Sequence, residues 1–193
     1  MSSNFFFLLS SLPRLAAGEK PLFDYDGFLA RCEGHLTTDE AEVLRRLSLS
    51  PDQPAGQSAV LDAWLDWERD MRNGMADYRS RRMQRQPGEW NRETRTVHPF
   101  DRRHLDELMA AGSGREREEA LAAFRLQALE TLAGGHVFDF EALVAYALRL
   151  LILLRLQAMS PEPGAEKFRE LALRTKEQAW QMRAAENQHS IAE

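Results

Sequence analysis

ALVAYALRLLILLRL, the stretch from Ala142 to Leu156, is an almost unbroken apolar run of fifteen residues. Only Arg149 and Arg155 interrupt it, so thirteen of the fifteen side chains are apolar. A helix that crosses a bilayer needs about 20 apolar residues, which is more than this run provides. We therefore predict a helix that other helices of a water-soluble protein surround on nearly every side.

The composition of the chain is that of an ordinary globular protein. Its 193 residues fit one domain, and hydrophobic and charged residues make up 44% and 28% of them. The formal net charge of −5 argues against non-specific DNA binding by the whole surface, but a local basic patch is compatible with it. Cys32 is the single cysteine and suits a reducing compartment. We expect a cytoplasmic protein, because the apolar opening from Phe5 to Leu9 is too short for a signal peptide.

The spacing of apolar residues is helical from Asp24 onward, and sustained alternation of the kind found in strands is missing. We predict an all-α fold, a bundle of about six to seven helices in a single domain over residues 1–193. A division into two lobes is compatible with the sequence, with a helical hairpin in residues 1–50 and a main bundle in residues 58–186 that carries a loop at 86–100. Residues 4–12 fit either a strand or a helix, which Pro13 ends in both cases.

Several helix ends have clear capping signals. Asp24 is placed to cap a first helix that Gly34 ends, and Thr37 with Glu40 forms a capping box for a second. Asp139 is placed to cap the apolar run described above. Ser160 and Pro161 mark the start of a last helix.

The longest predicted helix begins near residue 58 and carries one stripe of residues spaced by three and four. The stripe consists of Leu61, Trp64, Glu68, Met71, Met75, Tyr78 and Arg82. A kink is plausible where Asn73 and Gly74 interrupt the pattern. Glu68 falls inside the stripe, and Arg72 stands four residues later, at the spacing of an intrahelical ion pair. Glu68 is therefore either a paired residue at the edge of the stripe or a polar packing or interface residue.

Arginine is concentrated between residues 69 and 95, where eight arginines face four acids. Together with Trp64 and Trp67, these arginines fit three interpretations. The first is a solvated surface, and the second is a surface that binds an acidic protein. The third is a site that binds the backbone of a nucleic acid and stacks on its bases.

No pattern in the sequence indicates catalysis. Phosphate-binding loops, nucleophile elbows and paired metal-ligand motifs are missing, and the five histidines lack metal-ligand spacing. We therefore expect no catalytic residues, no metal, no cofactor and no small-molecule substrate. His136 follows Gly134 and Gly135, and we expect it to bind carbonyl groups at a helix C-terminus.

Three stretches carry a pattern that a known family shares. The first is the aromatic opening FFFLLSSLP at residues 5–13, followed by Pro21 and by Phe28 with Leu29. The second is WERDMRN at residues 67–73, and the third is FDFEALVAYALRL at residues 138–150. In this order they resemble a small bacterial family that accompanies the subunits of V-type (A/V-type) ATP synthases. The resemblance covers most of the chain, and its motifs are packing patterns without catalytic content.

This resemblance implies a non-catalytic accessory or connector subunit, analogous to the central-stalk C (eukaryotic d) subunit that joins the soluble rotor to the membrane ring. Its partners would be central-stalk or membrane-rotor subunits, which would hold it at the inner face of the membrane. The residues expected at the interface are Trp64, Trp67, Glu68, Arg72, Arg79 and Arg82. The alternative is a nucleic-acid-binding regulatory protein that uses the arginine-rich stretch at residues 69–95.

Overall fold

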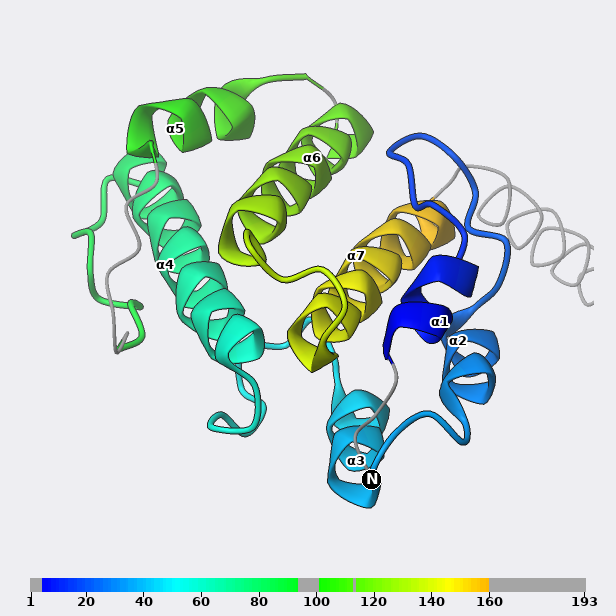
Figure 1. The fold of residues 1–193 in the computed structure, drawn as a ribbon. Coiled ribbons are helices and arrows are strands. Elements are labelled where there is room, and N and C mark those ends of the chain that lie inside the picture. Colours follow the sequence, from blue (N-terminus) through cyan, green and yellow to red (C-terminus); the bar gives the residue numbers. More distant parts are fainter. Residues whose placement is uncertain (1–4, 94–100, 113, 160–193) are drawn as a thin grey trace, which may run out of the picture. The chain divides into compact units, whose positions relative to one another are not determined.

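The computed structural model describes residues 5–93, 101–112 and 114–159. The contacts divide the chain into two units, Met1–Leu156 and Gln157–Glu193, and the account below concerns the first. Within the described residues the fold is all-helical, with seven helices and no strand (Figure 1). They are α1 (Phe5–Ser11), α2 (Tyr25–Cys32), α3 (Thr38–Arg46), α4 (Ala59–Arg82), α5 (Arg102–Ala110), α6 (Gly114–Leu132) and α7 (Phe140–Ala158). The predicted all-α class is confirmed.

The opening segment, which the sequence left open between strand and helix, forms α1. Phe5, Leu8 and Leu12 are all buried, and their spacing of three and four places them on one helical face. Ser11 donates a hydrogen bond from Oγ to the carbonyl oxygen of Leu8, at 2.7 Å, within the last turn.

The predicted hairpin of two short helices is confirmed in α2 and α3. The Oδ1 atom of Asp24 accepts a hydrogen bond from the backbone N–H of Gly27 at 2.8 Å, and the capping box of Thr37 and Glu40 is formed. Gly34 lies in the turn between the helices with φ of +78°, a conformation that favours glycine. The hydroxyl of Tyr25 donates to the carbonyl oxygen of Leu44 at 2.7 Å and joins the two helices.

The long helix α4 runs through Asn73 and Gly74 as one uninterrupted helix. Its start is held by two residues. Ser58 caps the backbone N–H of Leu61, and Glu141 at the beginning of α7 accepts hydrogen bonds from the Ser58 hydroxyl at 2.6 Å and from the Val60 N–H at 2.8 Å. The beginnings of α4 and α7 are therefore joined, although they are about 80 residues apart in the sequence.

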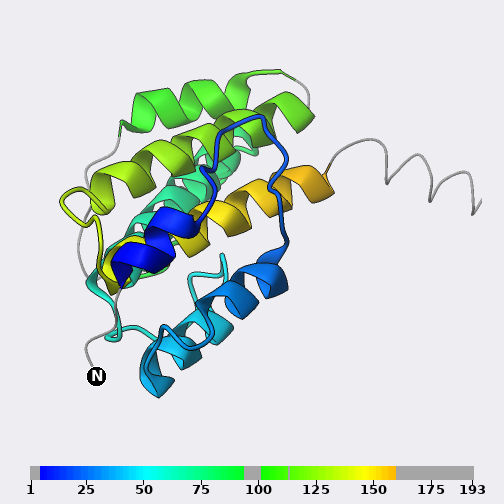
Figure 2. The same cartoon turned by 45° about the vertical axis from the view of Figure 1, so that its right-hand side comes forward.

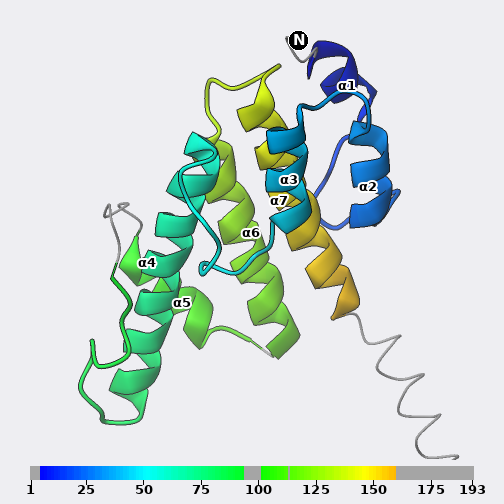
Figure 3. The same ribbon diagram turned by 90° about the horizontal axis from the view of Figure 1, so that it is seen from below.

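The helix α7 occupies the middle of the arrangement, between α6 and the hairpin of α2 and α3 (Figures 2 and 3). Seven of its residues are buried: Leu143, Val144, Ala147, Leu148, Leu150, Ile152 and Leu153. From Ala142 to Leu156 the only residue in the exposed class is Arg155. The expectation of a helix covered on nearly every side therefore holds. Among the helices of the described part, none is both long and apolar enough to cross a bilayer.

One hydrophobic cluster includes residues of all seven helices. Phe28 of the hairpin packs on Tyr146 of α7, with ring centroids 5.7 Å apart. The hairpin thus shares its core with the main helices within the first unit. The predicted loop is non-helical over residues 86–93, and residues 94–100 lie outside the described part, as does the predicted helix after Pro161. The boundaries proposed for the domain remain predictions.

Candidate interaction surface

The stripe of α4 that the sequence singled out lies inside the protein along its first three turns. Trp64, Trp67 and Glu68 are 0%, 4% and 1% exposed, and Met71 is fully buried. Trp64 stacks on Trp67 with ring centroids 5.4 Å apart, and Trp67 meets Phe124 of α6 at the same separation. This corrects the expectation that Trp64, Trp67 and Glu68 face a partner. Trp67 and Glu68 contact α6, and Trp64 is buried against Trp67, because large aromatic side chains stabilise helix packing through the apolar area they bury.

Glu68 is the centre of an ion-pair network between α4 and α6. Its Oε1 atom accepts from Nε of Arg72 at 2.8 Å, so the predicted intrahelical pair is confirmed. Arg125 of α6 binds the same carboxylate with two hydrogen bonds, Nε to Oε2 and Nη2 to Oε1, both at 3.0 Å. Arg72 also donates to the carbonyl oxygen of Leu49 at 3.0 Å. Glu68 is therefore a buried and fully paired packing residue.

Arg79 and Arg82 lie exposed near the C-terminal end of α4. Arg82 donates from Nη1 to the hydroxyl of Tyr78 at 3.3 Å, and the neighbouring Arg81 binds both carboxylate oxygens of Asp106 at 2.6 and 2.8 Å. The side chain of Arg79 has no hydrogen bond or ion pair among residues 5–93, 101–112 and 114–159. The interface role expected of Arg79 and Arg82 remains a prediction, and these are the two expected residues that the structure places in the exposed class, while Arg72 is partly exposed.

Half of the eight arginines between residues 69 and 95 form ion pairs within the protein. Ion pairs join Arg69 to Asp66, Arg72 to Glu68, Arg81 to Asp106 and Arg92 to Asp52. Arg95 lies outside the described residues. The positive surplus that a nucleic acid would meet is smaller than the sequence count suggests, because four of the eight guanidinium groups already have a carboxylate partner. The nucleic-acid alternative remains a prediction.

A second stripe on α4, which the sequence analysis missed, holds the neighbouring loop. It consists of the buried polar residues Asp66, Asp70, Asn73, Asp77 and Ser80. Asn73 exchanges two hydrogen bonds with the backbone of Arg92, Nδ2 to O at 2.8 Å and N to Oδ1 at 2.9 Å. Asp77 accepts from the backbone N–H of Gly88 at 2.9 Å and pairs with Arg102 at 3.1 Å. These five polar residues are spaced alternately by four and three in the sequence, which is the pattern that predicts a shared helical face.

Exposed aromatic side chains gather where α1 meets the beginning of α7. Phe6 and Phe7 of α1 and Val137 and Phe138 of the preceding loop are between 48% and 66% exposed. The rings of Phe6 and Phe138 are 4.7 Å apart, and Phe6 meets Phe7 at 5.5 Å in an edge-to-face arrangement. We call these four residues the aromatic cluster. Residues 5–13 and 138–150, far apart in the sequence, therefore meet at this cluster.

Beside the cluster, a groove of about 330 Å³ runs between α1, the end of α6 and α7. Its apolar walls come from Leu9, Leu12, Pro13, Leu15, Leu129, Ala133, Ala142 and Ala145, and its polar groups from Arg14, Glu130, His136, Tyr146 and Arg149. The hydroxyl of Tyr146 donates to the carbonyl oxygen of Pro13 at 2.9 Å. Burial raises the pKa of Tyr146 to about 12, so this hydroxyl keeps its proton at neutral pH.

His136 and Asp139 form a pair at the rim of the groove. The Nδ1 atom of His136 lies 2.7 Å from Oδ2 of Asp139, and Oδ1 of Asp139 accepts from the backbone N–H of Ala142. The hydrogen bond to Asp139 raises the pKa of His136 above its ordinary value. Burial pushes the pKa of Asp139 upward, but the bonds from His136 and Ala142 outweigh it and leave that pKa lowered. Asp139 caps α7 as predicted, whereas the His136 side chain binds this carboxylate and not the α6 carbonyls expected from the sequence.

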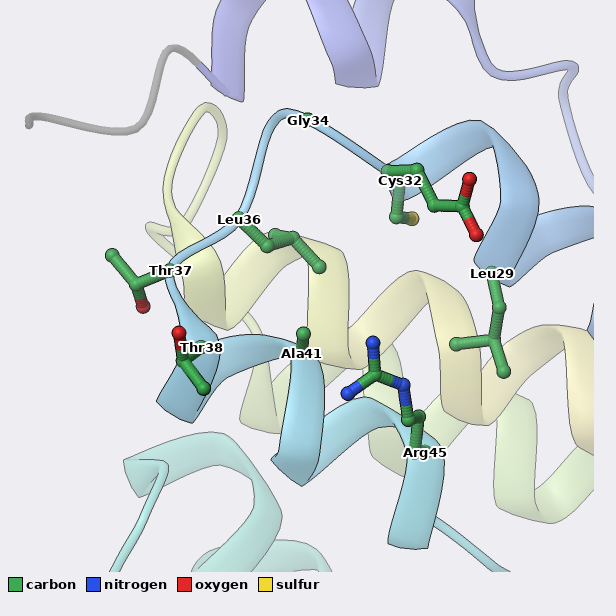
Figure 4. Close-up of a pocket in the computed structure, with 9 residues that line it drawn as sticks. Leu29, Cys32, Gly34, Leu36, Thr37, Thr38, Ala41 and Arg45 are labelled. Atoms are coloured by element: carbon green, nitrogen blue, oxygen red, sulfur yellow. The ribbon is translucent and has the colours of Figure 1, made fainter.

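A second pocket of about 330 Å³ lies between α2 and α3. Arg45 extends from α3 toward the space that Leu29 and Leu36 also face (Figure 4). Cys32 lies at the wall of this pocket but is buried, and burial raises the pKa of its thiol to about 11. The thiol is therefore protonated at neutral pH, which suits packing and not nucleophilic chemistry.

Within the part of the chain that the structure describes, no group of three or more His, Cys, Asp and Glu side chains is placed to hold a metal ion. Comparison of the chain with protein-family models, with curated proteins and with solved structures finds no match.

Proposed function

We propose that this protein is a non-catalytic accessory or connector subunit of a bacterial V-type ATP synthase that works through protein–protein contact. The observation that carries the proposal is the aromatic cluster, in which Phe6 and Phe138 meet at 4.7 Å and remain about half exposed. The largest apolar patch on the surface of a protein is often an interaction site. The two segments that form it belong to the stretches that resemble the ATP synthase-associated family.

The exposed arginines at the end of α4 provide a second contact in this proposal. Arg79 and Arg82 are charged groups that an acidic surface of a rotor subunit would attract. A connector of this kind transmits force through shape and charge, and it needs no nucleotide of its own.

The experiment is co-purification of the tagged full-length protein from its own cells. We expect rotor subunits of the ATP synthase to accompany it, and we expect the double charge reversal R79E/R82E to reduce their recovery about tenfold at low salt. The control is R45E/R46E, which reverses two exposed arginines at the end of α3. Recovery of the wild-type protein without any ATP synthase subunit would refute the proposed function.

A further inference from the structure

The groove beside the aromatic cluster is continuous with it. Phe6 of the cluster and Leu9 of the groove are three residues apart on α1, so they lie on the same side of this helix. His136 lines the groove, and Val137 and Phe138 of the cluster follow it directly in the chain. One apolar surface therefore extends from the cluster along the groove.

The α7 wall of the groove has the form of a trough. Ala142, Ala145 and Arg149 are spaced by three and four along α7, and the two alanines leave room beside the helix. A volume of about 330 Å³ is at the lower limit of small-molecule sites. Such a trough suits a few side chains that project from a helix lying along α7.

The charges of the groove favour an acidic occupant. Arg14 and Arg149 contribute two guanidinium groups against the single carboxylate of Glu130. Neither arginine forms an ion pair with any acid that the structure describes. Arg149 lies two helical turns beyond Ala142, roughly 10 Å along α7, so the cationic end of the groove lies away from His136 and the aromatic cluster.

The aromatic cluster alone is too small to hold a stable partner. An aromatic side chain offers about 150–250 Å², so the three half-exposed phenylalanines present roughly 300 Å² and Val137 adds less than about 100 Å². A stable dimer needs about 800 Å² on each partner. An occupant that reaches the needed area must therefore also fill the groove.

We propose that the groove and the aromatic cluster together bind one amphipathic helix of a partner protein. Apolar side chains of that helix at positions i, i+3 or i+4 and i+7 contact the cluster and the two alanines. An acidic side chain of the same helix pairs with Arg149. The inference rests on the proposed function, because it names the chemistry by which this protein would hold a subunit of the ATP synthase.

The first test places a photo-crosslinking amino acid at Ala145 of the full-length protein, expressed in its own cells. We expect a crosslink to a partner segment whose apolar residues have helical spacing and which contains Asp or Glu. The proposal is overturned by a crosslink to another copy of this chain, by a linked segment without an acid or helical spacing, or by no protein crosslink at all.

The second test compares two charge reversals on the same helix, using the partner identified by the crosslink. We expect R149E to weaken binding of the partner about tenfold. Changing the partner's acidic residue to arginine should restore binding to R149E. R155E reverses an exposed arginine of α7 that does not line the groove, and we expect it to change binding less than twofold. Equal effects of the two reversals would overturn the proposed pairing.

A145W provides an independent variant that fills the groove without changing its charge. The thermal unfolding midpoint of each variant is measured beside that of the wild-type protein. A loss of binding is attributed to the groove only where the two midpoints are equal, which separates loss of binding from loss of folding. If the wild-type protein recovers ATP synthase subunits and neither R149E nor A145W lowers that recovery, the groove proposal fails while the proposed function stands. If Ala145 crosslinks to an acidic amphipathic helix of an unrelated protein, the proposed function fails while the groove proposal stands.

Discussion

Glu68 combines a deeply buried position with a full set of hydrogen-bond partners. Its carboxylate binds Arg125 through two hydrogen bonds and Arg72 through one. Burial of a charge is costly unless the charge is paired, and removing one partner of a buried pair leaves the other uncompensated. The network therefore ties α4 to α6 at one defined position along each helix.

We predict that R125L lowers the free energy of unfolding by about 3 kcal/mol, because Glu68 would stay buried with the partly exposed Arg72 as its remaining partner. Urea denaturation measures the change. The control is R115L, which removes an exposed pair with Glu119 and should cost less than about 1 kcal/mol. Equal losses in the two variants would contradict the assignment of Glu68 as a buried anchor.

The pair of His136 and Asp139 makes a pH-dependent contribution to stability. Because the folded protein raises the pKa of His136 above 6.5, the contribution of His136 is complete below that pH and is lost as the pH rises through the raised pKa. The lowered pKa of Asp139 has the opposite consequence. Its contribution is complete above pH 3.8 and is lost as the pH falls through the lowered pKa.

We therefore expect the difference in melting temperature between the wild-type protein and H136N to be largest between about pH 3.8 and 6.5. The difference should shrink as the pH rises past the raised pKa of His136. Thermal unfolding followed by circular dichroism across this range measures it. A difference that is constant with pH, or that grows toward alkaline pH, would show that the pair is not formed.

At the scale of elements, α4 contacts two other parts of the chain through two different faces. On one side, Trp67 and Glu68 contact Phe124 and Arg125 of α6. The other side presents Asn73 and Asp77 to the backbone of the loop that follows the helix. A loop without secondary structure is held in place here by side-chain hydrogen bonds, which replace the backbone bonds that a helix or a sheet would provide.

We predict that N73A releases this loop while α4 remains helical. Loss of the two hydrogen bonds to Arg92 removes on the order of 1–3 kcal/mol from the closed loop, so trypsin should cleave after Arg85 and Arg92 about tenfold faster under native conditions. The control is N91A, which truncates an exposed asparagine in the same loop. Unchanged cleavage in N73A would show that other contacts hold the loop.

At the scale of the whole described unit, one core joins the hairpin of α2 and α3 to the main helices. Phe28 is fully buried and stacks on Tyr146 of α7, and α7 in turn is joined to the start of α4 through Glu141. A shared core predicts cooperative unfolding, since the hairpin cannot separate without exposing apolar surface of α7.

We predict that F28A lowers the free energy of unfolding by about 3–5 kcal/mol. The same loss should be measured for the unfolding of α4, although Phe28 lies in α2. The measurement is urea denaturation followed by tryptophan fluorescence in a W90F/W180F background, where the signal comes from Trp64 and Trp67 of α4.

F7A is the control, because Phe7 is mostly exposed and its truncation should change the stability by less than about 0.5 kcal/mol. If the hairpin unfolds as a separate lobe, the tryptophan transition of F28A will coincide with that of the wild-type protein.

Local signals in the sequence were sufficient for the helices and many of their ends. The capping residues Asp24, Thr37 and Asp139 act within three residues of their own position, so their hydrogen bonds can be predicted without knowledge of the fold. The apolar run in α7 and the pair of Glu68 with Arg72 can also be predicted locally, because helical spacing alone places their side chains.

Distant contacts decided the rest, because a helical stripe does not reveal what covers it. Trp64, Trp67 and Glu68 are expected at an interface from the sequence, yet all three are buried, and α6 supplies Phe124 and Arg125 to Trp67 and Glu68 from 57 residues away. The aromatic cluster likewise joins Phe6 and Phe138, which no local rule pairs. Capping and periodicity arise from backbone geometry within a few residues, whereas burial and surface depend on which helices pack together.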